Sequence, residues 1–566
     1  MSTTTANIAA VLPRMAAERA DQPAMRCPGG AGADGFARYD IVLTYGELDA
    51  RSDAIAAGLQ AYGIRRGTRT VVMVRPSPEF FLLMFALFKL GAVPVLDDPG
   101  IDRSALKECL DEAAPEAFIG IPLAQFGRRV FGWGLTSIKR VVTVGTRVWP
   151  LWWGATLAAL ERKGAALLAA KAARGEPSAM LADTHGDEVA AILFTSGSTG
   201  VPKGVVYRHR HFIAQIELLR EAFGMQPGGV DLPTFPPFAL FDPALGLTSI
   251  IPDMDPTRPA TADPKKLHDA IRRFGVTQLF GSPALMRVLA QHGESLPGVR
   301  LVTSAGAPVP PDVVATMRSL LPEDATFWTP YGATECLPVA VIEARELQST
   351  REATENGAGT CIGRPVAQNT VRIVRILDEA IPYWREDLVV PVGVVGEITV
   401  AGPSATDEYF ARPEATRMAK IRERVSAREE RIVHRMGDLG YFDAEGRLWF
   451  CGRKGHRVET AGGMMTTEQV EPIFNTHRRV ARTALVGVGA RGMQTPVLCV
   501  ELKPGVPDSE WVHVQAELER IAMRDPKTAR IHHFLRHPGF PVDIRHNAKI
   551  GREKLAEWAK GEVRVG

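Results

Sequence analysis

Between residues 188 and 223 a loop of very small residues lies between apolar segments, and this region constrains the fold more than any other. The run VAAILF at 189–194 is typical of a buried strand. The string TSGSTGVPKG at 195–204 interrupts it with three glycines and one proline. Apolar residues then recur at steps of four, three and four positions, as on one face of an amphipathic helix. Its residues are Phe212, Ile216, Leu219 and Phe223. We expect a strand, a compact loop, a second short strand and a helix.

The composition of this loop suits a polyphosphate. Gly, Ser and Thr expose backbone N–H groups and hydroxyls without side-chain bulk, and Lys203 adds a point charge. The nucleotide P-loop of kinases and GTPases requires Gly before the Lys, whereas Pro202 precedes Lys203 here. We therefore expect a different class of nucleotide-binding enzyme. The candidate phosphate-binding residues are Thr195, Ser196, Gly197, Ser198, Thr199, Gly200 and Lys203.

Strand-like and helical patterns alternate through most of the first 450 residues, which predicts a layered α/β fold with several sheets. The string LWFCGRKG at 448–455 ends a strand in a basic turn bracketed by glycines. We place a domain boundary there. The expected units are a large N-terminal domain of residues 1–452 and a small, mobile α+β C-terminal domain of residues 453–566.

Composition restricts the partners and the compartment. The 67 Lys and Arg residues nearly balance the 64 Asp and Glu residues, so the net charge of +3 offers no broad attraction to nucleic acid. The six cysteines are scattered without a C-x-x-C pair, and we expect reduced thiols in the cytoplasm.

Two apolar segments are candidates for membrane contact. The run FFLLMFALF at 80–88 is far shorter than the roughly 20 residues that cross a bilayer, so a buried helix is expected. The segment from Val148 to Leu160 carries three tryptophans; a packed helix is favoured, and contact with substrate or with a membrane surface stays open. At most, peripheral membrane contact is predicted.

The string FTSGSTGVPKG resembles the signature loop of the adenylate-forming superfamily, which includes acyl-CoA synthetases, peptide-synthetase adenylation domains and luciferases. Further strings resemble later motifs of this superfamily in the same order: SAGAP at 304–308, YGATE at 331–335, GEITVAGP at 396–403, MGDL at 436–439 and RHNAKIGR at 545–552. The resemblance covers residues from about 10 to 560. It implies that ATP adenylates a carboxylic acid.

The resemblance also implies roles for individual residues. Tyr331 would stack on adenine, Glu335 would bind Mg²⁺, and Asp438 would accept hydrogen bonds from the ribose hydroxyls. An aromatic face and a carboxylate suit these partners. Arg453 would reach ribose or phosphate. The other implied ATP- or AMP-binding residues are Gly306, Ala307, Pro308, Gly332, Ala333 and Thr334.

Lys549 would bridge the substrate carboxylate and the phosphate oxygens during adenylation. Its charge would offset the repulsion between two anions as the carboxylate approaches phosphorus. With Lys203 and Glu335 it completes the implied catalytic set.

Departures from the superfamily pattern concern coenzyme A. Lys454 is followed by Gly455, where many acyl-CoA synthetases have Asp or Lys, and AGGM at 461–464 replaces a sequence similar to S-G-x-R. Both departures weaken the prediction of thioester formation.

Three strings resemble the β-lactone synthetase family of bacterial long-chain olefin biosynthesis. They are FPPFALFDPALG at 235–246, IPDMDP at 251–256 and RHNAKIGREKL at 545–555. This resemblance implies a 2-alkyl-3-hydroxyalkanoic acid, a long-chain β-hydroxy acid, that is adenylated and closed to a β-lactone with release of AMP and diphosphate. It implies two pathway partners, a β-lactone decarboxylase and an NADPH-dependent 2-alkyl-3-ketoacid reductase.

The wall of the alkyl pocket is expected in two segments, although each residue could equally be ordinary core. The candidates are Phe238, Phe241, Asp242, Leu245, Gly281, Ser282 and Leu285. For the base that removes the 3-hydroxyl proton, Asp242, His211 and a phosphate oxygen of the leaving AMP remain alternatives. A fatty acyl-CoA synthetase and a non-catalytic acyl-adenylate binder are the competing functions.

Overall fold

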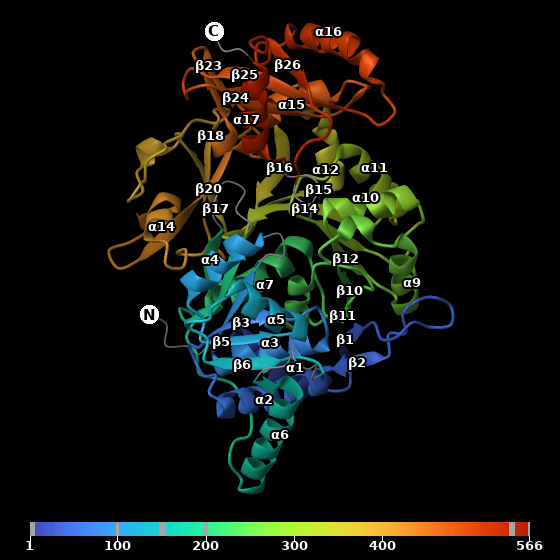
Figure 1. Ribbon diagram of the computed structural model, residues 1–566, viewed down its shortest axis with the longest axis vertical. Coiled ribbons are helices and arrows are strands. Elements are labelled where there is room, and N and C mark those ends of the chain that lie inside the picture. Colours follow the sequence, from blue (N-terminus) through green and yellow to red (C-terminus); the bar gives the residue numbers. More distant parts are fainter. Residues whose placement is uncertain (1–5, 98–100, 147–153, 196–201, 543–549, 564–566) are drawn as a thin grey trace.

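The computed structural model describes residues 6–97, 101–146, 154–195, 202–542 and 550–563. Within these ranges the strands form two large sheets and two small ones, with helices covering the large sheets (Figure 1). The predicted fold class, a large multi-sheet α/β region followed by a small α+β unit, is confirmed.

The first large sheet has seven strands and contains the strand that leads into the Gly-rich loop. Its order is β7 (Ala155–Thr156), β6 (Arg140–Thr143), β5 (Ala117–Gly120), β3 (Arg69–Met73), β4 (Val93–Asp97), β8 (Val189–Thr195) and β9 (Lys203–Arg208). All neighbours are parallel except β8 and β9, in which Thr195 lies opposite Lys203. Helix α7 (His209–Phe223) follows β9 directly. The predicted succession of strand, short strand and helix is confirmed.

The second large sheet has fourteen strands. Its path is β17 (Thr370–Val374), β18 (Gly396–Ala401), β20 (Glu430–Phe442), β21 (Leu448–Arg453), β16 (Thr360–Pro365), β15 (Cys336–Glu343), β14 (Thr326–Ala333), β13 (Leu301–Ser304), β12 (Gln278–Gly281), β10 (Val230–Pro233), β11 (Thr248–Ile250), β1 (Pro23–Cys27) and β2 (Ile41–Thr44). Strand β19 (Lys420–Arg424) pairs with β20 off this path. Strands β10 to β14 are parallel to one another, and strands from β15 onward are antiparallel.

Helices fill the space between and around the two sheets. In α3 (Pro78–Leu90) every residue from Phe80 to Leu90 is buried, as expected for a helix that is apolar on all sides. Its Lys89 is also buried, and its ammonium group lies 2.6 Å from Asp49 Oδ1 and 2.5 Å from Asp53 Oδ1. The prediction of a buried helix at 80–88 is confirmed. No described helix is long and apolar enough to cross a membrane.

The segment 148–160 is only partly described, because 147–153 lie outside the described residues. Leu157 begins α6 (Leu157–Ala173), and Leu157 and Leu160 are buried where α6 packs on α2 (Tyr45–Tyr62). The packed-helix interpretation therefore holds for the end of this segment.

The other helices and short turns lie along the edges and faces of these sheets. They are η1 (Ile8–Ala10), α1 (Val11–Arg19), α4 (Arg103–Ala113), α5 (Pro122–Phe131), η2 (Pro236–Leu240), α8 (Asp242–Leu245), η3 (Pro259–Thr261), α9 (Pro264–Phe274), α10 (Pro283–His292), α11 (Pro311–Leu320), α12 (Ala344–Ser349), α13 (Arg351–Glu355), η4 (Glu386–Leu388) and α14 (Pro413–Ala419).

Residues after Arg453 form their own sheets and cores. The elements are η5 (Lys454–His456), β22 (Val458–Thr460), β23 (Gly463–Met465), α15 (Thr467–Asn475), β24 (Val480–Val488), β25 (Thr495–Leu502), η6 (Asp508–Glu510), α16 (Trp511–Ala522), β26 (His533–Arg536) and α17 (Arg552–Glu562). Two apolar clusters here draw all their buried residues from positions 458 onward. This unit, red and orange in Figure 1, caps one end of the larger region.

Candidate active site

One buried tyrosine connects the lysine after the Gly-rich loop to the expected metal-binding carboxylate. The Tyr409 hydroxyl donates to Glu335 Oε1 at 2.6 Å, and Lys203 Nζ lies 5.1 Å from the centre of the Tyr409 ring. Burial raises the pKa of Tyr409, so its hydroxyl stays protonated and remains a donor. Two charges that are far apart in the sequence thus lie against opposite parts of one side chain.

Backbone hydrogen bonds explain why Tyr409 lies there. Phe410 N donates to Gly204 O at 2.7 Å, which ties the tyrosine segment to β9. On its other side, the Thr406 backbone N–H and hydroxyl both donate to Glu335 O, at 2.8 and 3.1 Å. The segment 406–410 is therefore a bridge between the two motifs, and we name it the 406–410 bridge.

A buried lysine supports the 406–410 bridge. Lys420 Nζ donates to the Thr406 carbonyl and, at 3.2 Å, to the Thr406 hydroxyl, and it lies 5.8 Å from the Tyr409 ring centre. Burial lowers the pKa of Lys420 to about 8. Sequence reasoning missed Tyr409 and Lys420, because their contacts are to backbone and to residues distant in sequence, which no local pattern reveals.

Asp438 is held from two sides. On β20 it lies opposite Arg453 of β21, whose Nη1 is 3.1 Å from Asp438 Oδ1, and Tyr331 donates its hydroxyl to Asp438 Oδ2 at 2.6 Å. Asp438 is buried, and burial raises its pKa while the nearby Arg453 charge opposes that rise. The structure thus brings together the three residues predicted to contact adenine and ribose.

The remaining predicted nucleotide residues border the same region. Gly306 follows β13 with a φ of +101°, a conformation that favours glycine, and Ala307 and Pro308 continue this partly exposed turn. Gly332 and Ala333 end β14, and the carbonyl of the next residue, Thr334, accepts a hydrogen bond from Tyr207 of β9. A side chain on Gly332 would approach Cys336 O to 2.7 Å, so this position accepts only hydrogen.

Six predicted residues lie outside the described residues. They are Ser196, Gly197, Ser198, Thr199, Gly200 and Lys549. Thr195, which ends β8, is described. Beyond position 549, Ile550 pairs with Val542, and Arg552 forms a bidentate ion pair with Glu471, with Nη2 to Oε2 at 2.9 Å.

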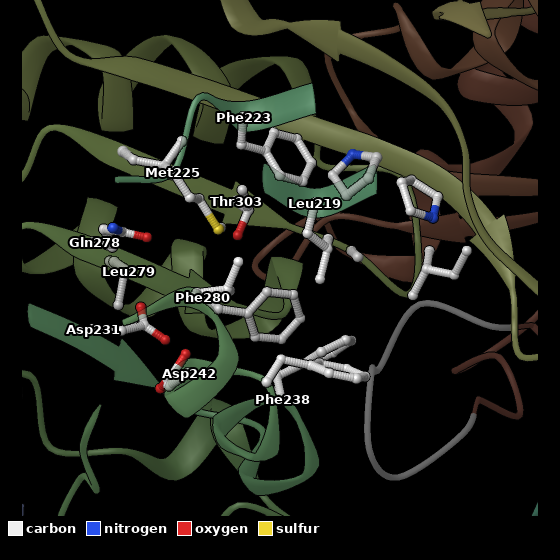
Figure 2. A pocket seen from close by; sticks show the side chains of 17 residues that line it. Leu219, Phe223, Met225, Asp231, Phe238, Asp242, Gln278, Leu279, Phe280 and Thr303 are labelled. Carbon is white, nitrogen blue, oxygen red and sulfur yellow. The ribbon is translucent and has the colours of Figure 1, made fainter. Parts of the chain in front are cut away.

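An apolar cavity lies beside the nucleotide residues. Ala305 and Pro330, the neighbours of Gly306 and Tyr331, both line it. The rest of its wall comes from α7, β10, η2, α8, β12, β13 and β15, from Met225 just after α7, and from Phe241 between η2 and α8 (Figure 2). These residues are Leu219, Phe223, Met225, Asp231, Phe238, Phe241, Asp242, Leu245, Gln278, Leu279, Phe280, Leu301, Thr303, Leu337 and Pro338.

Four of the seven predicted pocket residues line this cavity: Phe238, Phe241, Asp242 and Leu245. Phe238 packs on Phe280, with ring centres 4.4 Å apart. Gly281, Ser282 and Leu285 do not line it. Ser282 caps the start of α10, where its Oγ accepts from Leu285 N at 3.4 Å, and the fully buried Leu285 packs in a core cluster with residues of α9 and α11. These three residues lie where β12 turns into the start of α10. The sequence pattern does not distinguish residues of such a turn from residues that line a cavity.

Two buried carboxyl groups face each other in the cavity wall, where Figure 2 shows Asp231 next to Asp242. Asp242 Oδ2 accepts a hydrogen bond from Ser249 Oγ at 2.5 Å. Burial raises the pKa of Asp242 to about 7, and burial together with the Asp242 charge raises that of Asp231. Asp231 was not predicted, because a lone Asp in an apolar strand carries no recognisable motif.

His211, the other candidate base, has a structural position. Its Nδ1 accepts from Arg208 N at 3.0 Å and its Nε2 lies 3.7 Å from Asp407 Oδ2. It is fully buried, is not among the residues that line the cavity, and burial lowers its pKa to about 3. A proton acceptor for the substrate must reach the cavity, which favours Asp242 over His211.

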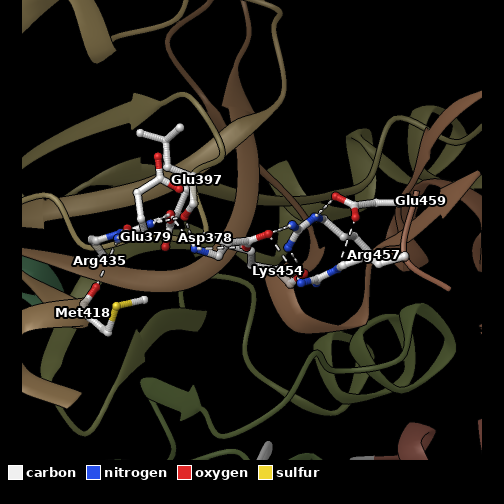
Figure 3. Close-up of polar contacts among 10 residues, drawn as sticks. Asp378, Glu379, Glu397, Met418, Arg435, Lys454, Arg457 and Glu459 are labelled. Carbon is white, nitrogen blue, oxygen red and sulfur yellow. Dashed lines mark hydrogen bonds and ion pairs between the residues drawn. The ribbon is translucent and has the colours of Figure 1, made fainter. Parts of the chain in front are cut away.

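Polar contacts anchor the chain just after Arg453 (Figure 3). Lys454 Nζ donates to Leu377 O at 2.7 Å and lies 3.1 Å from Glu397 Oε2. Glu397 is buried in β18, where it also pairs with Arg435 at 2.6 Å. The GEITVAGP motif thus has a structural role, because its glutamate holds the lysine that follows Arg453.

A second set of contacts lies three residues further on. Arg457 Nη2 is 2.5 Å from Asp378 Oδ2, and Arg457 Nε is 2.7 Å from Glu459 Oε1. Arg491 joins the same Asp378 oxygen at 3.4 Å. Asp378 therefore links the larger region to the C-terminal unit.

The fold and this site define the class. Residues 12–410 match the model of the AMP-binding enzyme family, so the chain belongs to this family and is an adenylate-forming ligase that uses ATP. Within it, the chain is 71% identical over 557 residues to the olefin beta-lactone synthetase of Xanthomonas campestris pv. campestris, covering 98% of each chain. It is 70% identical over 558 residues to the protein of the same name from Stenotrophomonas maltophilia, again over 98% of each.

Solved structures confirm the fold at lower identity. An amide bond synthetase from Marinactinospora thermotolerans superposes with a TM-score of 0.75 at 21% identity, covering 97% of this chain and 99% of that one. An O-succinylbenzoate coenzyme A synthetase from Bacillus subtilis, solved in complex with AMP, superposes with a TM-score of 0.72 at 18% identity, covering 96% and 97%.

Proposed function

We propose that the protein adenylates a 2-alkyl-3-hydroxyalkanoic acid with ATP and closes it to a β-lactone, releasing diphosphate and AMP. The observation that carries this proposal is the apolar cavity that starts at Ala305 and Pro330, directly beside the nucleotide residues. A long alkyl chain would lie in the cavity while its carboxyl group meets the nucleotide. The 71% identity to a protein named olefin beta-lactone synthetase supports the choice of reaction.

In the first half-reaction a carboxylate oxygen of the substrate attacks the α-phosphorus of ATP, and the bond to diphosphate breaks. Lys203 would hold the phosphates, and Asp438 with Arg453 would hold the ribose. Lys549 would stand between the two anions and lower their repulsion. The contacts of Asp438 with Tyr331 and Arg453 keep its carboxylate fixed, so little reorganisation is needed when the nucleotide binds.

Glu335 is the side chain that would hold Mg²⁺. A hard cation prefers oxygen ligands, and Tyr409 occupies only one carboxylate oxygen of Glu335, so the residue fits this ion. When bound, Mg²⁺ would neutralise phosphate charge. The 406–410 bridge connects Glu335 to the strand that carries Lys203.

In the second half-reaction the 3-hydroxyl oxygen attacks the acyl carbon, and the bond from that carbon to AMP breaks. The nucleophile is already attached to the substrate, so its high effective concentration helps to offset the strain of a four-membered ring. The hydroxyl proton passes either to a phosphate oxygen of AMP or to Asp242. The apolar wall excludes the water that would hydrolyse the adenylate.

We infer that the C-terminal unit reorients between the two half-reactions about a pivot just after Lys454, carrying Lys549 to and from the nucleotide. Reduced cysteines fit the proposed cytoplasmic location, since all six are free and buried. The β-lactone product has to be consumed by a decarboxylase, and the 3-hydroxy acid supplied by a ketoacid reductase. Both enzymes are therefore proposed pathway partners.

A mass-spectrometric assay tests the reaction. The protein is incubated with ATP, Mg²⁺ and a synthetic 2-alkyl-3-hydroxy acid, with and without coenzyme A. We expect AMP, diphosphate and a product lighter than the acid by one water, independent of coenzyme A. The 3-deoxy acid is the matched control, because it can be adenylated but cannot close a ring.

Two results would contradict the proposal. Product formation that requires coenzyme A and yields a thioester would identify an acyl-CoA synthetase. Diphosphate release with only free acid recovered would show adenylation without ring closure.

A further inference from the structure

Helix α5 (Pro122–Phe131) buries polar side chains and exposes apolar ones. Gln125 is fully buried and donates to Val142 O at 2.8 Å. Arg128 is 5% exposed, and its guanidinium lies over the Phe118 ring at 5.6 Å. On the outer side, Leu123, Phe126 and Val130 are 63%, 45% and 57% exposed. A helix selected only for contact with water would have the opposite arrangement.

The exposed apolar surface continues past the end of the helix. Phe131 is 36% and Leu135 52% exposed, and Phe131 stacks on the buried Trp133 with ring centres 5.4 Å apart. We name the set Leu123, Phe126, Val130, Phe131 and Leu135 the α5 face. Trp133 and the buried residues of α5 lie beneath this surface and support it. Clustered exposed apolar residues of this kind mark interaction sites.

Basic residues predominate in the segment that follows β5, although Glu108 and Asp111 of α4 and Glu116 add acidic groups at its border. No Asp or Glu occurs between Glu116 and Glu161, whereas Arg129, Lys139 and Arg140 are exposed in the same stretch. The adjacent α4 (Arg103–Ala113) contributes Lys107, which packs near Gly132 and pairs with Asp111 of its own helix. The segment is therefore both apolar and basic, in a chain whose overall charge is nearly balanced.

We propose that the α5 face docks peripherally on an anionic phospholipid bilayer. Leu, Phe and Val side chains on one face of a helix bind at the boundary between headgroups and acyl chains, and flanking Lys and Arg residues add attraction to anionic lipids. A protein partner is less favoured, because protein interfaces are depleted of lysine. Since α5 does not span a bilayer, the contact is superficial and reversible.

This docking does not depend on the reaction proposed above. It would, however, bring the enzyme to the surface where long-chain acids partition. A failure of lipid binding would leave the assay for β-lactone formation unaffected, and a failure of that assay would leave lipid binding unaffected.

Vesicle co-sedimentation of the full chain tests the proposal. Vesicles of phosphatidylglycerol and phosphatidylethanolamine are compared with vesicles of phosphatidylcholine alone. We expect binding to the anionic vesicles that weakens as salt is raised. The triple variant Leu123→Ser, Phe126→Ser, Val130→Ser should lower the partition coefficient by about tenfold or more, since each apolar side chain contributes burial in the interface.

The matched control replaces exposed apolar residues elsewhere, with Val512→Ser and Met523→Ser, which are 72% and 80% exposed on and just after α16 (Trp511–Ala522). This control should bind vesicles as the parent protein does. The thermal midpoint of each variant is measured to show that it folds. The variant Lys139→Gln should weaken binding to anionic vesicles by a smaller factor than the triple variant does. No binding to anionic vesicles, or equal loss in the control, would overturn the proposal. So would a concentration-dependent dimer of the parent protein that only the triple variant abolishes, because the α5 face would then be a protein interface.

Discussion

The two ends of the proposed site are built in different ways. At the nucleotide end, charged and hydroxylated residues from a few contiguous motifs are fixed by short hydrogen bonds, such as Tyr409 to Glu335 and Tyr331 to Asp438. At the acyl end, mostly apolar residues from seven or more elements form a cavity, with two carboxyl groups among them. A phosphate and a ribose demand particular donors in particular places. An alkyl chain demands only a volume of suitable shape.

This difference predicts how variants divide. Changes at the nucleotide end should slow diphosphate release with every acid tested. Changes at the acyl end should alter the KM for the acid and leave the KM for ATP unchanged.

The largest effect is expected for Lys549→Ala. Without its charge the carboxylate and the α-phosphate repel each other during attack, so diphosphate release should fall by several orders of magnitude, on the order of a thousandfold. ATP binding should persist, as measured by equilibrium titration. Lys554→Ala, an exposed residue on α17, is the control and should keep normal turnover. Near-normal turnover of Lys549→Ala would remove Lys549 from the mechanism.

The next effect is expected for Asp438→Ala, which removes the ribose acceptor and leaves Arg453 and Tyr331 without their partner. The KM for ATP should rise by roughly a hundredfold, because hydrogen bonds to a charged, buried group are strong. Steady-state diphosphate release at varied ATP measures this. An unchanged KM for ATP would contradict the assignment of Asp438 to ribose.

Tyr409→Phe should have an intermediate effect. The ring that contacts Lys203 is retained while the hydroxyl bound to Glu335 is lost. We expect about a tenfold loss of kcat for diphosphate release, since one hydrogen bond to a carboxylate is removed, and a higher Mg²⁺ concentration at half-maximal rate. Tyr441→Phe, whose hydroxyl bonds to Ala358 O instead, serves as the control. A loss of rate with unchanged Mg²⁺ dependence would argue against positioning of Glu335.

At the acyl end, Phe238→Ala should raise the KM for a long-chain acid roughly tenfold, because the Phe238 ring packs on Phe280 in the cavity wall. The KM for ATP should not change. Leu285→Val, a core substitution outside the cavity, is the comparison: it should lower the thermal midpoint and leave both KM values unaltered. Equal effects on both substrates would show that the two ends are not separable.

The smallest effect concerns pH. Burial raises the pKa of Asp242 from its ordinary value of 3.8 to about 7, so between these pH values the folded state binds more protons than the unfolded state. Stability should therefore fall as pH rises from about 4 to about 7. Asp242→Asn should remove part of this fall and raise the thermal midpoint by a few degrees at pH 8, with little change at pH 4.

The same variant separates the two routes for the hydroxyl proton. Normal diphosphate release with normal lactone formation by Asp242→Asn would assign the proton to AMP. Normal diphosphate release with loss of the lactone would assign it to Asp242. A thermal midpoint that rises with pH in the parent protein would contradict the pKa argument.

The nucleotide end could be proposed from the sequence because its chemistry is concentrated in short strings, and the roles of its residues stay predictions. The Gly-rich loop, YGATE and MGDL could each be interpreted from their own residues, without knowledge of their contacts in the fold. Among the described residues of these motifs, Tyr331 contacts Asp438, and Tyr409 lies between Lys203 and Glu335. The sequence predicted the acyl end in part. Phe238 and Phe241 line the cavity, whereas Leu285 does not, because an apolar residue has the same pattern in a pocket wall and in a core.

Residues that act through backbone contacts were not predictable. Lys420 donates to the backbone carbonyl of Thr406. Tyr409 donates to the carboxylate of Glu335, which lies more than seventy positions earlier in the chain. Asp231 is recognisable only beside Asp242, and α5 only when its buried face is seen. Each of these depends on chain segments that meet only after folding.

The anchoring of Lys454 limits where the C-terminal unit can turn. Its ammonium group is held by buried Glu397, and breaking such a pair leaves a charge uncompensated in the interior. Arg457 is also buried, but its partner Asp378 is half-exposed, and Arg457 keeps its ion pair with Glu459 of its own unit if the contact with Asp378 breaks. Any rotation of the smaller unit should therefore begin after position 454, with Gly455 and His456 as the pivot. The axis of that movement would pass within two residues of Arg453, so a large swing of the distant end would displace the ribose contact very little.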